Sequence, residues 1–202
     1  MSLVGILAYG SLIDDPGKEL EPLISHHIVG VRTPFSVEFA RSSSSRDGAP
    51  TLVPIEDGGA QVLGVILVLD PKVNVQQAED LIWRRETRNE YSDKHYSRPT
   101  NPSSNTVLIE KLRDLVKVEN VLFTKIGANI RNRTPEHLAD LAIYSARREA
   151  GAKRMDGISY LISVKKQGIN TPLMPLYEAN IIKKAKAQTL EEAYDKIRSG
   201  DA

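Results

Sequence analysis

Residues 4–13 set the strongest constraint on what this chain can fold into. Residues 4–8 form an apolar run of strand length, which stops at Tyr9-Gly10-Ser11 and is followed by the turn-forming Asp14-Asp15-Pro16-Gly17. A buried strand that ends in a glycine-containing elbow presents consecutive backbone N–H groups at the edge of its sheet. Such a nest can bind a carboxylate or an oxyanion, although turn chemistry alone also explains these residues.

The charge balance and the lack of cysteine narrow the classes of function. The 202 residues include 27 basic and 26 acidic side chains, so no overall charge favours nucleic acid or an anionic membrane surface. With no cysteine, disulfides, thiolate metal sites and a cysteine nucleophile are excluded. No apolar run approaches the roughly 18 residues that span a bilayer. Because the first strand begins close to Met1, we expect no targeting segment and a cytoplasmic protein.

Strand signals dominate the first third of the chain. Strands are expected around residues 28–32, 35–39, 51–55 and 61–69. In residues 35–39, Phe and Val alternate with Ser and Glu, which is typical of a half-buried strand. Residues 41–48 are expected to form a polar loop. Asp57-Gly58-Gly59 predicts a hairpin turn between the last two strands, so this third reads as a β meander.

Helix signals dominate the remainder. Asn74 and Gln77 form a candidate capping box for a helix over residues 75–88, and Thr134-Pro135 starts a helix that is expected to reach about residue 150. Further helices are expected at 173–186 and 190–197, and a strand at 121–126; residues 106–118 and 157–164 fit helix or extended structure. We therefore predict one α+β domain over residues 1–202, a small β-barrel or curved mixed sheet flanked by helices.

Glu86 is the acidic residue with the greatest potential for chemistry. It lies in Trp83-Arg84-Arg85-Glu86-Thr87-Arg88, at the end of the expected helix. If its carboxylate faces the sheet, burial and the neighbouring arginines would tune it for general acid or base catalysis. Two other interpretations stay open. The run could be a solvated helical face with ordinary ion pairs, or a short basic patch for nucleic acid.

The histidines and the glycine elbow carry no recognised motif. His26 and His27 are adjacent and cannot converge on one ion from a strand, while His95 and His137 are isolated. Ser11 lacks the Gly-x-Ser-x-Gly frame of a nucleophile elbow, and no Gly-Lys-Ser/Thr follows Gly10 as in a phosphate loop. We therefore expect no bound metal.

Several short stretches resemble the γ-glutamylcyclotransferase-like family. Tyr9-Gly10-Ser11-Leu12 follows the opening strand, segments 48–54 and 62–65 come next, and Arg85-Glu86 then precedes Tyr91 at a helix end. The Arg-Glu-x-x-x-x-Tyr spacing is most similar to the ChaC-like branch, which degrades glutathione. Segments 156–161, 171–173 and 190–194 are similar to that branch as well.

The resemblance implies a reaction. In such enzymes the α-amine of a γ-glutamyl amide attacks its own γ-carbonyl, giving 5-oxoproline and a free amine. Because the attack is intramolecular, it needs no protein nucleophile, metal or cofactor, and effective molarities can reach roughly 10⁵ M. The resemblance assigns the proton shuttle to Glu86. The backbone of Tyr9-Gly10-Ser11-Leu12 would bind the oxyanion and the glutamyl carboxylate.

Other site residues follow from the substrate that the resemblance implies. Arg41 and Arg46 are candidates for pairing with its second carboxylate, since arginine and carboxylate form two parallel hydrogen bonds; both could equally be ordinary surface residues. Tyr91 could line the pocket or cap the core. Residues 98–133 have no counterpart in the family pattern and could form an insertion or a lid.

The expected partner is therefore a small γ-glutamyl compound, with glutathione, γ-glutamyl amino acids and γ-glutamyl amines left open. A homodimer is compatible with the sequence, whereas nucleic acid and membrane are not expected as partners. The competing hypothesis is a non-catalytic module on the same fold that binds a small carboxylate or a protein. In that case an arginine would lock Glu86 and prevent proton exchange.

Overall fold

The computed structural model describes residues 3–200, and the chain divides into two compact units. Unit 1 combines Met1–Thr33 with Leu63–Gly127, and unit 2 combines Pro34–Val62 with Ala128–Ala202. The protein is of mixed α and β structure, as the sequence predicts, with a mixed five-stranded sheet and seven α-helices among the described residues. Within residues 3–200, no helix has both the length and the apolar character needed to cross a bilayer.

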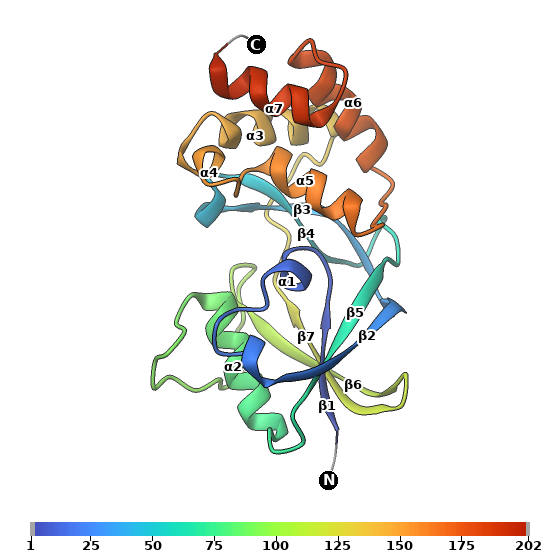
Figure 1. Ribbon diagram of the computed structural model, residues 1–202, viewed down its shortest axis with the longest axis vertical. Coiled ribbons are helices and arrows are strands. Elements are labelled where there is room, and N and C mark those ends of the chain that lie inside the picture. The colour runs from blue at the N-terminus through green and yellow to red at the C-terminus, as the bar shows by residue number, and fades with distance from the viewer. Residues whose placement is uncertain (1–2, 201–202) are drawn as a thin grey trace. The chain divides into compact units, whose positions relative to one another are not determined.

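The sheet of unit 1 is built around β1 (Val4–Ala8), whose five residues are all buried. Strand order is β2-β5-β1-β7-β6, with β2 at Ile24–Arg32, β5 at Leu63–Leu69, β6 at Leu108–Leu115 and β7 at Val118–Lys125 (Figure 1). Ile6 of β1 lies opposite Leu67 of the antiparallel β5 and opposite Leu122 of the parallel β7. All five side chains are buried, so both faces of β1 are covered, and this explains the continuous apolar run.

Helix α2 (Val75–Thr87) covers one face of this sheet. Its apolar side chains Ala78, Leu81 and Ile82 pack with Ile6 and other core residues of β1, β5 and β7. Each large side chain buried in this way contributes about 1.5–3 kcal/mol. The predicted capping box is confirmed: the Gln77 N–H donates to Asn74 Oδ1 (3.0 Å), and the Asn74 N–H donates to Gln77 Oε1 (2.9 Å).

Unit 2 is a two-stranded antiparallel sheet covered by helices. Strands β3 (Ser36–Ser43) and β4 (Ala49–Ile55) pack with α3 (Pro135–Ala146) and α5 (Gly157–Lys166), and the short α4 (Glu149–Ala152), α6 (Met174–Lys184) and α7 (Leu190–Ser199) complete the unit (Figure 1). Phe39 on β3 makes edge contacts with Tyr160 of α5 and Tyr177 of α6, at ring-centroid distances of 6.0 and 5.2 Å. These aromatic contacts join the sheet to the helices.

The predicted β meander is wrong. Asp57-Gly58-Gly59 does not connect a hairpin, because β4 pairs only with β3, whereas β5 pairs with β1 and β2. Ala60 forms a bridge to Val37 instead. Turn residues define a change of direction but not the partner of the following strand. Here burial against β1 determines that partner.

The expected polar side of residues 35–39 is also wrong. Glu38 is 2 % exposed, because residues of the connection between α5 and α6 lie against it. Its Oε1 accepts hydrogen bonds from Thr171 Oγ1 (2.5 Å) and from the Phe39 N–H (2.9 Å), and its Oε2 accepts one from the Leu173 N–H (3.1 Å). Three donors satisfy the hydrogen-bonding capacity of this buried carboxylate. The alternation of polar and apolar residues therefore did not indicate a solvent-exposed face of the strand here.

Other boundaries differ in detail. The helix that begins at Pro135 ends at Ala146, and residues 149–152 form the separate α4. The two ambiguous stretches are resolved, with residues 108–115 forming strand β6 and residues 157–166 forming helix α5. Asp156 accounts for the second outcome, since its side chain caps α5 by accepting from the Ile158 and Ser159 N–H groups.

Candidate functional site

The elbow after β1 is a glycine turn that opens a short helix, α1 (Ser11–Asp14). Gly10 adopts φ 61° and ψ −136°, a conformation that side chains rarely allow. The Ile13 N–H donates to the Gly10 carbonyl and the Asp15 N–H to the Ser11 carbonyl. The N–H groups of Ser11 and Leu12, at the start of α1, have no acceptor within the helix, as the predicted nest requires.

Glu86 lies in the last turn of α2. Its Oε1 accepts a 2.6 Å ion-pair hydrogen bond from Arg85 Nη1, and its side chain is 24 % exposed. Oε2 makes no hydrogen bond to another residue within 3–200. The carboxylate is thus half-buried, held by one oxygen and open at the other.

Helix α2 ends immediately after Glu86 in a Schellman motif. The Asn89 N–H donates to the Arg84 carbonyl (2.8 Å) and the Arg88 N–H donates to the Arg85 carbonyl (3.3 Å). Arg88 adopts φ 56°, the left-handed conformation that this motif requires. The motif fixes where the helix stops and therefore where Glu86 sits.

Arg85 connects Glu86 to the segment that follows the elbow. Its Nη2 donates a 2.5 Å hydrogen bond to the Asp15 carbonyl oxygen, and Asp15 in turn closes α1 through its N–H to Ser11. A Cβ added to Gly17 would lie 2.6 Å from Arg85 Cγ, so only glycine allows this close approach. One arginine therefore contacts both the candidate acid–base residue and the chain that leaves the candidate oxyanion nest.

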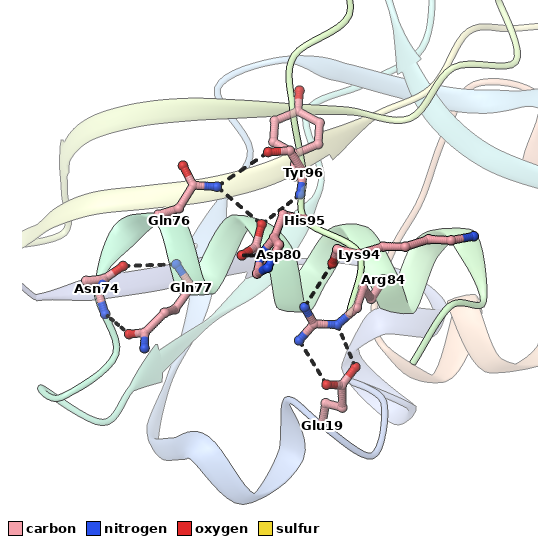
Figure 2. A network of polar contacts seen from close by, with 9 residues as sticks. All are labelled: Glu19, Asn74, Gln76, Gln77, Asp80, Arg84, Lys94, His95 and Tyr96. Atoms are coloured by element: carbon pink, nitrogen blue, oxygen red, sulfur yellow. Dashed lines mark hydrogen bonds and ion pairs between the residues drawn. The ribbon is translucent and has the colours of Figure 1, made fainter. Parts of the chain in front are cut away.

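A second arginine attaches the same helix end to the same segment. Arg84 binds Glu19 through Nε–Oε2 (3.0 Å) and Nη2–Oε1 (2.8 Å), and Arg84 Nη1 donates to the Lys94 carbonyl (3.2 Å), as Figure 2 shows. The Tyr91 backbone N–H also contributes to lowering the pKa of the Glu19 carboxyl. The hydrogen bond from Arg84 holds the pKa of Glu19 below its ordinary value and outweighs the effect of burial.

A polar network around Asp80 attaches the following loop to the middle of α2 (Figure 2). Asp80, 5 % exposed, accepts hydrogen bonds from His95 Nδ1 (2.7 Å), the Tyr96 N–H (2.7 Å) and Gln76 Nε2 (3.2 Å). Burial raises the pKa of the Asp80 carboxyl. The hydrogen bonds together have a larger, opposite effect, so the pKa lies below its ordinary value. The network secures the coil that carries Tyr91.

The predicted site residues fall in both units. Tyr9, Gly10, Ser11, Leu12, Glu86 and Tyr91 lie in unit 1, and Arg41 lies in unit 2. Within unit 1, Arg85 connects Glu86 with the end of the elbow helix. Tyr91 is 72 % exposed and so does not cap the core.

The placement of Arg41 on a polar loop is wrong. Strand β3 continues to Ser43, so Arg41 lies within the strand, opposite Thr51, and burial lowers its pKa. The strand extends because Thr51 to Ala49 pair with it, which the serine-rich sequence did not indicate. Arg46 follows in a short 3₁₀ turn, donates to the Met155 carbonyl and stacks on Tyr160.

Sequence reasoning did not find Glu19 or Asp80. Glu19 reads as a surface residue, since its partner Arg84 is 65 positions away. For Asp80 a signal was available: it occupies the apolar face of the α2 pattern, between Ala78 and Leu81. A charged residue on a buried face needs partners, which here come from the polar coil.

Two of the three arginines of the run are not available at the surface. Arg84 and Arg85 are only 12 % and 13 % exposed at their side chains and are bound to acidic or carbonyl oxygens. Trp83 packs against the core of unit 1 and lies near Tyr96, with ring centroids 6.4 Å apart. These contacts leave little of the run to bind phosphates, so they count against the nucleic-acid hypothesis.

In residues 3–200, no three His, Asp or Glu side chains come together in a way that could hold a metal ion. The chain matched neither the protein-family models nor the curated proteins with which it was compared.

Proposed function

We propose that the protein has the γ-glutamylcyclotransferase-like fold and cyclises a γ-glutamyl amide to 5-oxoproline. The observation that supports this proposal best is the position of Arg85, which holds Glu86 by Nη1 and the Asp15 carbonyl by Nη2. The candidate proton shuttle is thereby attached to the segment that begins at the Gly10 elbow. The reaction needs these two features on one framework.

In the proposed reaction, the α-amine nitrogen of the glutamyl group forms a bond to its own γ-carbonyl carbon. The amide C–N bond then breaks and releases 5-oxoproline and an amine. Glu86 accepts the proton that the α-amine loses and delivers it to the leaving nitrogen. The N–H groups of Ser11 and Leu12 would stabilise the negative oxygen of the tetrahedral intermediate, while Tyr91 of the same unit would contact the rest of the substrate.

The bonding of Glu86 is compatible with a shuttle. Arg85 holds Oε1, whereas Oε2 has no bonded partner among the described residues and can receive and release a proton. A carboxylate fixed at one oxygen is oriented without being fully neutralised.

A second function is favoured by the same ion pair. A 2.6 Å contact with Arg85 is also what a non-catalytic module would use to hold the Glu86 carboxylate in place. Such a module would bind a small carboxylate ligand at the elbow and would not turn it over. Ligand affinity would then be independent of pH.

Release of 5-oxoproline distinguishes the two functions. Wild type, Glu86→Gln and Glu79→Gln are incubated with glutathione and with a panel of γ-glutamyl amino acids and amines. Glu79 is a matched control on the same helix. We expect turnover by wild type, a loss of roughly 100-fold or more in Glu86→Gln, and a change of less than about twofold in Glu79→Gln.

Two results would reject the proposal in part or in whole. No release from any substrate by folded wild-type protein would leave the binding module as the better explanation. Turnover that persists in Glu86→Gln would remove Glu86 from the shuttle role. Release from one substrate class alone would identify the leaving amine.

A further inference from the structure

Glu19 and Arg84 form a nearly buried ion pair beside the candidate site, and the sequence pattern gave it no role. The side chains are 14 % and 12 % exposed, and two parallel hydrogen bonds of 3.0 and 2.8 Å join them. A fork of this kind fixes both distance and orientation, which a single contact with a lysine would not. Surface ion pairs of the ordinary kind are mobile and lack this geometry.

The pair joins three segments of unit 1. Glu19 belongs to the connection that leaves the elbow, Arg84 precedes the Arg85–Glu86 pair on α2, and the Lys94 carbonyl that Arg84 also binds lies in the coil after the helix end. The Glu19 backbone N–H also donates a hydrogen bond to Glu90 Oε1 at 3.4 Å. Glu19 is therefore bonded through both its backbone and its carboxylate to the region around Glu86.

Tyr91, in the coil that follows α2, has a strained backbone close to this pair. Its φ of 60° is unusual for a bulky side chain, and its ring is 72 % exposed, so apolar packing does not hold it there. The pair instead holds the coil three residues further on, where Arg84 Nη1 donates to the Lys94 carbonyl at 3.2 Å. A strained backbone that persists needs such surrounding bonds, and strain of this kind is concentrated at functional sites.

We infer that Glu19 is a positioning residue, which acts with Arg84 as a clamp that holds the Glu86 end of α2 and the coil after it against the segment leaving the elbow. This inference rests on the proposed function for its catalytic consequence. The clamp touches no substrate. It sets the position of Glu86, and an error of about 1 Å in such a position can cost up to roughly 100-fold in rate.

The test compares Glu19→Gln with Glu110→Gln. Glu110 is a matched control because it forms the same two-bond pair with Arg98 in the same unit, at 2.7 and 3.2 Å, but more exposed. For Glu19→Gln we expect kcat to fall between roughly tenfold and 100-fold, with KM changed less than about threefold. Glu110→Gln should stay within about twofold of wild type in both constants.

A double-mutant cycle separates the clamp from a general loss of stability. Arg84→Gln should lower kcat to a similar extent, and Glu19→Gln with Arg84→Gln should be no worse than either single variant. Additive losses, or a kcat for Glu19→Gln equal to that of Glu110→Gln, would overturn the inference. Should Glu19→Gln fail to fold by circular dichroism, Arg84→Lys, which keeps the charge but not the fork, takes its place with the same expectation.

Hydrogen exchange keeps the inference separate from the proposed activity. Amides of residues 88–93 should exchange at least roughly tenfold faster in Glu19→Gln than in wild type. Their exchange rates in Glu110→Gln should equal those of wild type. If wild type releases no 5-oxoproline, the proposed function is rejected. The exchange rates then decide by themselves whether the clamp exists. Exchange that is unaltered in Glu19→Gln would reject the clamp in either case.

Discussion

Arg85 Nη2 lies 2.5 Å from the carbonyl oxygen of Asp15, which precedes it by 70 positions in the chain. The bond requires the connection after α1 to approach the helix closely, and Gly17 permits that approach. Arg85 thus has a structural role and an electrostatic one, because its other nitrogen binds Glu86. The following predictions test this packing and other features of the two units.

Gly17→Ala should destabilise unit 1 more than Gly30→Ala does. Both glycines have positive φ, 93° and 72°, but a Cβ at Gly17 would lie 2.6 Å from Arg85 Cγ, whereas a Cβ at Gly30 has nothing within 4 Å. Both variants carry backbone strain, and Gly17→Ala adds a clash of about 1–2 kcal/mol. Urea unfolding followed by circular dichroism measures the difference. Equal losses would mean that Arg85 moves aside freely.

Asp80→Asn should destabilise the protein near neutral pH, and the effect should shrink in acid. The folded-state pKa lies below the ordinary value of 3.8, so the ionised Asp80 stabilises the fold above that value. This contribution is lost as the pH falls through the folded-state pKa. We expect a cost of about 1–3 kcal/mol near neutral pH.

Thermal unfolding of wild type and Asp80→Asn between neutral pH and pH values below 3.8 measures this convergence. Asp93→Asn is the control, because Asp93 is exposed on the same coil. A stability difference between wild type and Asp80→Asn that stays constant with pH would show that the negative charge of Asp80 does not contribute to the stability of the network.

Arg88→Gly should stabilise the protein. Arg88 occupies the left-handed position of the Schellman motif with φ 56°, where glycine has no steric cost. After the greater flexibility of glycine in the unfolded chain is counted, the gain is about 0.5 kcal/mol. The control is Arg147→Gly at the end of α3, where φ is −72° and a loss of about 0.5–1 kcal/mol is expected. Denaturant midpoints that move in the same direction for both would contradict the conformational explanation.

Tyr177→Phe should raise stability while Tyr194→Phe lowers it. The Tyr177 hydroxyl is buried and has no hydrogen-bond partner among residues 3–200, and burial raises its pKa well above the ordinary value. The Tyr194 hydroxyl donates to the Gly151 carbonyl at 2.6 Å. Removing an unpaired hydroxyl should gain about 1 kcal/mol, and removing a paired one should cost about the same. Calorimetric melting of the two variants measures the changes in stability. Changes of the same sign would contradict the prediction.

Local signals in the sequence predicted the local structure well. Asn74 with Gln77, and Thr134 with Pro135, each located a helix start, because capping depends on residues only a few positions apart. Strand pairing was not predictable in this way. The partner of β5 is β1, near the other end of unit 1, and Asp57-Gly58-Gly59 carries no information about it.

The candidate site was predictable only in its chemical types. The elbow and Glu86 were identified from a glycine turn and an acid among arginines, and the structure connects them through Arg85. Which arginine would bind which acid could not be foreseen. Arg84 and Arg85 are adjacent, yet they reach Glu19 and Asp15 respectively through a fold that brings distant segments together.

The division of the chain into units has a consequence for its synthesis. The chain passes between the units three times, after Thr33, Val62 and Gly127, so neither unit is one uninterrupted segment. A ribosome synthesises all of unit 1 before it makes any α-helix of unit 2. Phe39 and Glu38 of β3 therefore stay uncovered until the helices in the final third of the chain have emerged and can pack with β3 and β4. During that interval the nascent protein exposes apolar side chains of β3 and β4 that are buried in the folded chain, which is the kind of surface that favours aggregation.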